Sequence, residues 1–271
     1  METGFTGVER TSLVTLYLRA LESRSRDSLL TDRAAEEAVR RLGPGFVDLK
    51  MRIAAGDRYL VALRARQLDL WAADFLSAHP GAVVAQLGCG LDTRALRLDL
   101  PPGTLWFDVD FPEVVALRGR LFPGLPARPG YRMVGASVTD PRWSQDLPRD
   151  RPALVIAEGL LMYLSEPNVR RLLLSLTELF PTGALIFDGL RPWVVKVSHT
   201  FPRVYGDFTM NWAIRTPADV TRLNPRLHPV TDTAVISQYP LIPSRPYRTL
   251  YRLLTRIPPM RDMMRLYHFS F

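Results

Sequence analysis

The 271-residue sequence contains one cysteine, Cys89, and only two lysines. A single cysteine excludes an internal disulfide and is typical of a protein from the reducing cytoplasm. No apolar run approaches the roughly twenty residues that a membrane-spanning helix needs. The amino terminus also lacks the apolar core of a secretory signal. We therefore expect a cytoplasmic protein that does not span a membrane.

Two further classes of site find little support. His, Cys, Asp and Glu do not cluster at metal-ligand spacing, so the sequence predicts no metal site. The formal net charge of +8 comes almost entirely from arginine, which could neutralise the phosphates of a nucleic acid. These arginines are spread along the chain without a dense basic block, which argues against a nucleic-acid partner. An acidic small molecule remains compatible with the charge.

The most informative stretch is the apolar run of residues 82–87, which leads into Gly88-Cys89-Gly90. Glycines at such a turn allow backbone conformations that a Cβ would hinder, and they let a ligand approach the main chain. The position between them needs a small side chain, and no histidine lies near it in sequence. We therefore interpret Cys89 as structural and not as a nucleophile.

A second apolar run, residues 105–110, ends in Asp110 about twenty residues after the glycine turn. A carboxylate at the tip of the neighbouring strand can accept hydrogen bonds from a ribose diol. Asp108 shares a strand face with Asp110 by period two and is expected to brace the following turn. Thr93 replaces the third glycine of a dinucleotide fingerprint, which favours a nucleoside ligand without a diphosphate. An ordinary strand-turn-helix followed by an acidic residue is the alternative interpretation.

Three motifs in order resemble the leucine carboxyl methyltransferase family: residues 87–94 (LGCGLDTR), 108–114 (DVDFPEV) and 157–164 (AEGLLMYL). The resemblance is closer to the bacterial branch, the polyketide-tailoring O-methyltransferases of the tetracenomycin type, and it spans roughly residues 11–188. It implies S-adenosylmethionine as cofactor and a class I fold. That fold is α/β and Rossmann-like: a mostly parallel seven-stranded sheet with helices on both faces, plus a helical amino-terminal region and a cap.

The resemblance also implies roles for cofactor-binding residues. Gly88 and Gly90 allow close approach, and Asp110 takes the ribose. Arg64, or else Arg66, approaches the methionine carboxylate, for which a guanidinium fork is suited. Glu158 contacts the methionine amino group.

The adenine contacts of the family fall on Ser137 and Val138. Serine stands where a family aspartate is common, so the amide of Val138 or the side chain of Asp140 becomes the alternative contact. Two other family-typical residues, Asp92 and Arg94, are expected to hold the glycine loop through a local salt bridge.

Residues 190–226 carry aromatic and methionine side chains, Trp193 and Met210 among them, without a clean period. Such a segment suggests an adaptable wall for a flat substrate, although a cap helix packing on the sheet would give the same pattern. The candidates for substrate contact are Tyr163, Arg191, Tyr205 and Trp212.

The acceptor oxygen decides what catalysis requires. A carboxylate is ionised at neutral pH and needs no base, only a cationic clamp such as Arg191, whereas a phenol has a pKa near 10. A phenolic acceptor would need a general base. His199 is the first candidate for this role, and His228 and His268 are the others.

The length suits one large domain, and we expect a single methyltransferase domain over residues 1–271. Within it, residues 1–80 form a helical region, with Thr31 or Asp32 capping the helix at 31–42. Residues 81–188 form the cofactor-binding core, 189–264 the cap and late core, and 265–271 a terminal strand. The expected helices are 11–42, 57–79 and 167–180. The expected strands are 82–87, 105–110, 153–157, 184–188 and 265–271, and residues 131–140 form a further strand and its exit loop.

The sequence therefore predicts a methyltransferase, monomeric or homodimeric, that transfers a methyl group to an oxygen of a small aromatic, polyketide-like metabolite in bacterial secondary metabolism. The alternatives are a protein or peptide carboxyl methyltransferase and, from another class, a non-catalytic nucleoside-binding protein.

Overall fold

The computed structural model describes residues 9–43, 57–200 and 209–271. Its centre is a seven-stranded sheet with the order β3-β2-β1-β4-β5-β7-β6, in which the first five strands of the chain run parallel and β7 is antiparallel to both its neighbours. The predicted mostly parallel sheet of seven strands is confirmed. The strands are β1 Val83–Leu87, β2 Leu105–Asp110, β3 Tyr131–Gly135, β4 Ala153–Ala157, β5 Gly183–Leu190, β6 His228–Ala234 and β7 Met264–Ser270.

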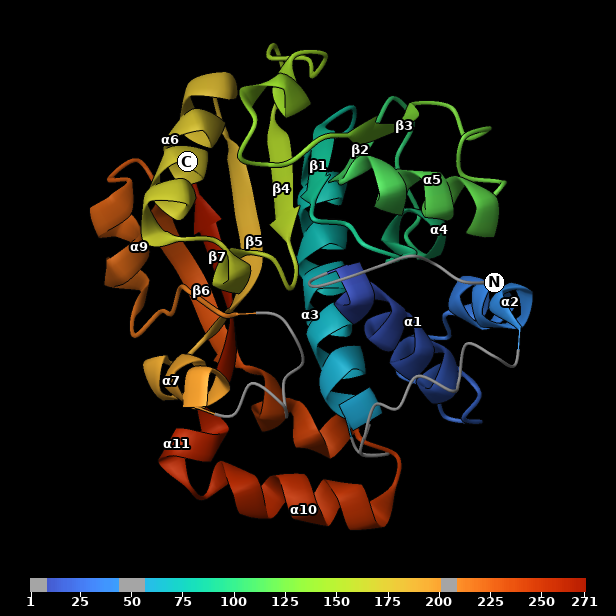
Figure 1. Cartoon of the computed structure of the whole chain (residues 1–271), viewed down its shortest axis with the longest axis vertical. Helices are drawn as coiled ribbons and strands as arrows, with labels where there is room; N and C mark the ends of the chain where they lie inside the picture. Colours follow the sequence, from blue (N-terminus) through green and yellow to red (C-terminus); the bar gives the residue numbers. More distant parts are fainter. Residues whose placement is uncertain (1–8, 44–56, 201–208) are drawn as a thin grey trace.

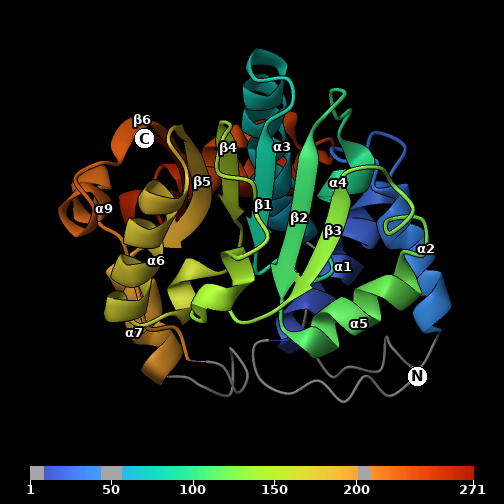
Figure 2. The same ribbon diagram turned by 90° about the horizontal axis from the view of Figure 1, so that it is seen from above.

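The helices and 3₁₀ turns cover both faces of this sheet (Figures 1 and 2). They are α1 Glu9–Ser23, α2 Arg33–Leu42, α3 Asp57–Ala78, α4 Arg94–Arg97, α5 Pro112–Leu121, η2 Pro141–Ser144, η3 Leu161–Tyr163, α6 Glu166–Leu179, α7 Pro192–Thr200, α9 Pro217–Leu223, η4 Val235–Leu241, α10 Arg245–Thr255 and α11 Pro258–Arg261.

The central strands are buried on both faces, which explains their unbroken apolar runs. Every residue of β1 and β4 is buried. Because side chains alternate along a strand, Val84 packs on the face that α3 covers, whereas Val83 and Ala85 face α6. Figure 2 shows α3 and α6 on opposite sides of the sheet.

The amino-terminal helices begin and end at the predicted signals. Asp32 caps α2 by accepting a hydrogen bond from the amide of Ala35 at 3.0 Å, and Gly43, with a φ of 82°, follows the last turn. The long helix expected at 57–79 is α3. None of the described helices is long and apolar enough to cross a membrane.

The carboxy-terminal part contains two elements that the sequence did not predict. β6 is an edge strand whose side chains are mostly exposed, and its register shifts between Pro229 and Thr231. Its pairing depends on backbone hydrogen bonds to β7, so it lacks an apolar signal, and proline is tolerated at an edge. The second element is α10, which tolerates Pro246 because this proline lies in the first helical turn, where no amide donor is needed.

β5 is the point where the parallel and antiparallel parts meet. Ile186 pairs with Ile156 on one side and with His268 on the other, and it is fully buried. We expect Ile186→Ala to lower the free energy of unfolding by about 2–5 kcal/mol, because the lost side chain leaves a cavity. Urea denaturation measures this. Leu253→Ala, on the exposed side of α10, is the control and should change stability by less than about 0.5 kcal/mol.

Candidate functional site

A pocket opens at the carboxyl ends of β1, β2 and β4. β1 is the first strand of the chain and has β2 on one side and β4 on the other, so the strand order reverses here. In open α/β sheets ligands bind at such a switch point. The lining residues are Thr11, Ser12, Thr15, Arg19, Arg64, Gln86, Gly88, Cys89, Gly90, Leu91, Asp92, Asp110, Phe111, Val114, Glu158, Gly159, Leu160 and Tyr163.

The glycine turn after β1 has the left-handed backbone that the sequence predicts. Gly88 has a φ of 58° and Gly90 a φ of 50°. A Cβ on Gly88 would lie 2.9 Å from the Leu160 side chain, and one on Gly90 would lie 3.0 Å from Cβ of Ser12. Cys89 between them is buried, and burial raises the pKa of its thiol well above the usual value, so it stays protonated. This agrees with the structural role expected for Cys89.

Asp110 is held at the tip of β2 by two backbone amides. Its Oδ2 accepts from the amide of Gly90 at 2.6 Å and its Oδ1 from the amide of Phe111 at 2.7 Å. Burial raises the pKa of Asp110, while these two hydrogen bonds oppose the rise. The carboxylate therefore faces the pocket in a fixed orientation.

Asp108 has a different role from Asp110, although both lie on one strand face. It is fully buried, accepts from the Trp106 indole at 2.8 Å and pairs with Arg118 and the hydroxyl of Tyr131. Arg118 also donates to the carbonyls of Gly90 and Asp92 at 2.9 and 2.6 Å. Asp108 therefore braces the glycine turn after β1 through Arg118, and not the turn after β2 that the sequence suggested.

Arg64 reaches the pocket from α3, whereas Arg66 does not line it. Nε of Arg64 donates to Glu158 at 2.8 Å, and a terminal nitrogen donates to Asp188 at 3.1 Å. Asp188 also accepts from the amide of Gly159 at 2.5 Å. The guanidinium is thus fixed between the tips of β4 and β5.

The charge on Glu158 is stabilised from two sides. Burial alone would raise the pKa of Glu158, but Arg64 and Arg94 outweigh it and lower the pKa below its ordinary value. Asp188 behaves oppositely: burial raises its pKa, and Arg64 compensates only in part. At neutral pH, Glu158 is a carboxylate beside the guanidinium of Arg64. These two charges are complementary to the ammonium and carboxylate groups of a free amino acid.

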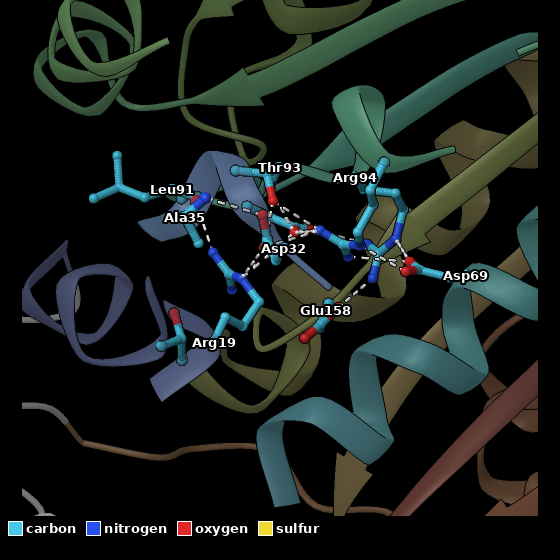
Figure 3. Close-up of polar contacts among 12 residues, drawn as sticks. Arg19, Asp32, Ala35, Asp69, Leu91, Thr93, Arg94 and Glu158 are labelled. Carbon is cyan, nitrogen blue, oxygen red and sulfur yellow. Dashed lines mark hydrogen bonds and ion pairs between the residues drawn. The ribbon is translucent and has the colours of Figure 1, made fainter. Parts of the chain in front are cut away.

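Arg94 is the hub of a buried ion-pair network (Figure 3). It has no solvent exposure and pairs with Asp69 at 2.6 Å, Glu158 at 2.6 Å and Asp92 at 2.9 Å. Burial would lower the pKa of Arg94, but these three carboxylates raise it. The predicted Asp92–Arg94 pair is present, and the network extends beyond it to α3 and to β4.

Arg19 of the first helix and Asp32, which caps the second, join the same network (Figure 3). Arg19 on α1 donates to Asp32 at 3.2 Å and to the Leu91 carbonyl at 2.7 Å. Asp32 also accepts from the hydroxyl of Thr93 at 2.5 Å. α1 is thereby fastened to the loop that follows the glycine turn.

Several predicted site residues lie elsewhere. Ser137 and Val138 follow β3 but are not among the described lining residues, and Asp140 pairs with Arg142. Trp212 is buried in the core, and Arg191 begins the connection from β5 to α7. Tyr205 lies outside the described residues.

The three candidate histidines are also away from the described lining of the pocket. His199 is exposed on α7, with Nε2 at 2.5 Å from the carbonyl oxygen of Met210. His228 is exposed on the edge strand β6, and His268 on β7 packs against Trp71. Of the predicted substrate contacts, Tyr163 is the one that the structure brings to the pocket.

Two lining features were not predicted. Gln86 donates to Asp92 at 2.7 Å, and its one signal in the sequence is a polar residue inside an apolar strand. α1 contributes Thr11, Ser12 and Thr15, residues whose small hydroxyl side chains carry no motif.

The family model described as leucine carboxyl methyltransferase matches residues 12–177. The chain belongs to this family. It is 41% identical over 269 residues to the tetracenomycin polyketide synthesis O-methyltransferase TcmP of Streptomyces glaucescens, covering 98% of this chain and 97% of that protein. It is 37% identical over 198 residues to the S-adenosyl-L-methionine-dependent methyltransferase dpfgK of Gibberella zeae, covering 68% and 66% of the two chains.

Solved structures agree on the fold. A putative methyltransferase from Thermobifida fusca superposes with a TM-score of 0.58 at 19% identity, covering 93% of both chains. A geranyl diphosphate methyltransferase in complex with S-adenosylmethionine gives a TM-score of 0.52 at 13% identity, covering 80% of this chain and 90% of that one. The fold is that of the class I methyltransferases. Together with the family, this makes the chain an S-adenosylmethionine-dependent methyltransferase.

The residues present fit this cofactor. The glycine turn leaves the main chain open to close approach, and Asp110 is oriented by backbone amides at the adjacent strand tip. Arg64 and Glu158 place opposite charges side by side at the far wall. These residues correspond to a nucleoside at one end and a zwitterionic amino acid at the other.

The role of Asp110 can be tested by binding. We expect Asp110→Ala to lower the affinity for S-adenosylmethionine about ten- to hundredfold, because one or two charge-assisted hydrogen bonds to the ribose are lost. Calorimetric titration measures the dissociation constant, and circular dichroism checks the fold. Asp150→Ala removes an exposed carboxylate paired with Arg151 and serves as the control. A folded Asp110→Ala protein with unchanged affinity would remove the ribose assignment.

The Arg94 network should be visible in acid unfolding. Arg94→Met removes one buried cationic partner from each of three carboxylates, which keep only Arg64 or Arg97. It should cost about 3–5 kcal/mol at pH 7. The pKa values of Asp92 and Glu158 are lowered in the fold, so their contribution is present above the ordinary carboxyl pKa of about 4 and lost as the pH falls below it.

The stability gap between Arg94→Met and the wild type should therefore narrow as the pH falls below about 4. Guanidinium unfolding at several pH values measures it. Arg142→Met, which breaks an exposed pair with Asp140, should leave stability unchanged. An equal gap at every pH would contradict an electrostatic role for Arg94.

Proposed function

We propose that this methyltransferase transfers the methyl group of S-adenosylmethionine to a carboxylate on a flat, polyketide-like aromatic acid. The observation that carries the proposal is the similarity to TcmP, which extends over nearly the whole of both chains. The similarity therefore includes the part of the chain beyond residue 177, where the family match ends. The choice of a carboxylate as acceptor rests on the composition of the pocket.

Each end of the cofactor has protein groups suited to it. Asp110 is oriented to accept hydrogen bonds from the ribose hydroxyls. Arg64 is suited to the methionine carboxylate and Glu158 to the amino group, because their charges are opposite and adjacent. S-adenosylmethionine supplies the methyl group on a sulfonium, and the protein aligns it with the acceptor oxygen.

The described lining residues favour an acceptor that is already ionised. They include no histidine, and the carboxylate of Glu158 is engaged by two arginines. Tyr163 is the only phenol among them; burial raises its pKa, so it stays protonated at neutral pH. A carboxylate acceptor needs no base, because its pKa lies near 4. Catalysis then consists of alignment and of removing water from the reacting atoms.

The amino-terminal helix has a part in that removal of water. Thr11, Ser12 and Thr15 line the pocket from α1, and Arg19 fastens this helix to the Leu91 carbonyl. α1 therefore forms a wall over the glycine turn that limits access of solvent to the sulfonium. The same contacts make the wall part of the folded core.

The cofactor and the acceptor oxygen can be tested in sequence. Calorimetry should show binding of S-adenosylmethionine and none of NAD. With an aromatic carboxylic acid as acceptor, kcat should be nearly constant between about pH 6 and pH 9, because the acceptor is ionised throughout.

The behaviour of His199→Ala provides the matching control. It should keep normal turnover, since no proton has to be removed. A kcat that increases with pH around a pKa near 7, together with loss of activity in His199→Ala, would instead support a phenolic acceptor and a general base. Binding of S-adenosylmethionine without methylation of carboxylic acids or phenols would overturn the proposal.

A further inference from the structure

A separate apolar cluster lies beside the cofactor pocket, at the carboxyl ends of β4 and β5. We call it the Trp193 cluster. Its buried members are Met162, Leu190, Val194 and Val195, and packed against them are Tyr163, Trp193, Met210, Ala213, Met263 and Met264.

Tyr163 connects this cluster to the cofactor pocket. It lines the pocket and also packs against the Trp193 cluster. On the pocket side, its neighbours at the tips of β4 and β5 are Glu158 and Arg64, the pair proposed to hold the methionine part. An acceptor that meets the methyl group there would lie on the side of Tyr163 where the Trp193 cluster begins.

The cluster is held in place by backbone hydrogen bonds from several segments. The amides of Asn211 and Trp212 donate to the Met162 carbonyl at 2.7 and 3.2 Å. The amide of Ile214 donates to Leu190 at 2.9 Å, and the amide of Arg191 donates to Met263 at 3.1 Å. The methionine side chains are adaptable, whereas the backbone that carries them is fixed. This combination suits an apolar surface beside the pocket that can repack around a flat ligand.

One polar atom in this apolar surrounding has no partner. The indole Nε1 of Trp193 is buried and makes no hydrogen bond within the part of the chain that the structure describes. Buried tryptophan N–H groups usually find an acceptor, so such a group requires an explanation. Among the described residues, Thr104 Oγ1, Gln238 Nε2 and one nitrogen each of Arg58, Arg94 and Arg118 are also buried without a hydrogen bond. The three guanidinium groups pair through their other nitrogens. Trp193 is the group of this kind that packs against the apolar cluster beside the pocket. An indole has only one donor.

The chemistry of this donor selects the ligand group. An indole N–H can donate and cannot accept. A hydroxyl bound there would bring a proton of its own into apolar surroundings, where it would need a further acceptor. A carbonyl oxygen brings no proton and is satisfied by the indole. The site therefore fits a ring carbonyl of a flat, quinone-like acid.

We propose that the Trp193 cluster is the acceptor-binding site and that Nε1 of Trp193 donates a hydrogen bond to a ring carbonyl of the acceptor. This rests on the proposed function and deepens it, because it names the group beside the methylated carboxylate that the enzyme recognises. Trp193 acts here as a specificity-determining residue, with no part in the methyl transfer itself.

The test combines one variant with two acceptors. Trp193→Phe keeps an aromatic ring and removes the N–H. Anthraquinone-2-carboxylate and anthracene-2-carboxylate share shape and carboxylate, and only the first has ring carbonyls. We expect Trp193→Phe to raise the KM for the anthraquinone acid, and its Kd measured by calorimetry, about tenfold. The same constants for the anthracene acid should change by less than about twofold. The affinity for S-adenosylmethionine should stay unchanged.

The matched control is Trp71→Phe, a partly buried tryptophan on α3 that packs against His268 at 5.5 Å between ring centroids. It should leave both acids unaffected. Equal losses on the two acids in Trp193→Phe would indicate a packing role and overturn the proposed hydrogen bond. No loss on either acid would place the acceptor elsewhere and would leave the proposed function intact. A wild-type protein that binds S-adenosylmethionine but neither binds nor methylates either acid, nor any other aromatic acid, would overturn the proposed function, and this inference with it.

Discussion

Neutralising buried arginines is the constraint on which the site depends. Arg94 has no contact with solvent, and leaving it unpaired would cost far more than the fold can tolerate. Its three carboxylates come from α3, the glycine loop and the turn after β4, so pairing one guanidinium fixes three segments relative to one another. Glu158, held by Arg94, also pairs with Arg64 and so fixes the position of that guanidinium. The proposed binding pair is thus oriented by a network that also holds the fold together.

The cofactor half of the molecule could be predicted because its signals are local. Gly88 and Gly90 have positive φ, and only glycine adopts that backbone at little cost. Asp110 stands at the end of an apolar strand, where topology decides its position. The full network could not be predicted, since Asp69 pairs with Arg94 across 25 residues and no spacing rule relates them.

The carboxy-terminal half was less predictable because its elements depend on tertiary contacts. β6 consists mostly of exposed side chains and exists as a strand through its pairing with β7. Residues 190–226 were expected to form a pocket wall, and Trp193 and Met210 do lie in one apolar cluster with Tyr163. The predicted substrate contacts Arg191 and Trp212 do not line the described pocket. The prediction failed because an irregular segment has no repeating apolar pattern that would show which side chains face the pocket.

This difference between the halves has a physical basis. Charged networks around a glycine turn accept few substitutions, since each loss leaves a buried group unpaired. An apolar wall accepts many substitutions, provided that the total volume of its side chains is kept. The match to the family model ends at residue 177, so it includes Met162 and Tyr163 but not the other members of the Trp193 cluster. A cofactor site fixed by such a network, joined to an apolar wall, would allow the acceptor to change while the methyl donor stays the same. Within such a wall, a single donor such as the Trp193 indole discriminates between acceptors more sharply than further apolar contact would.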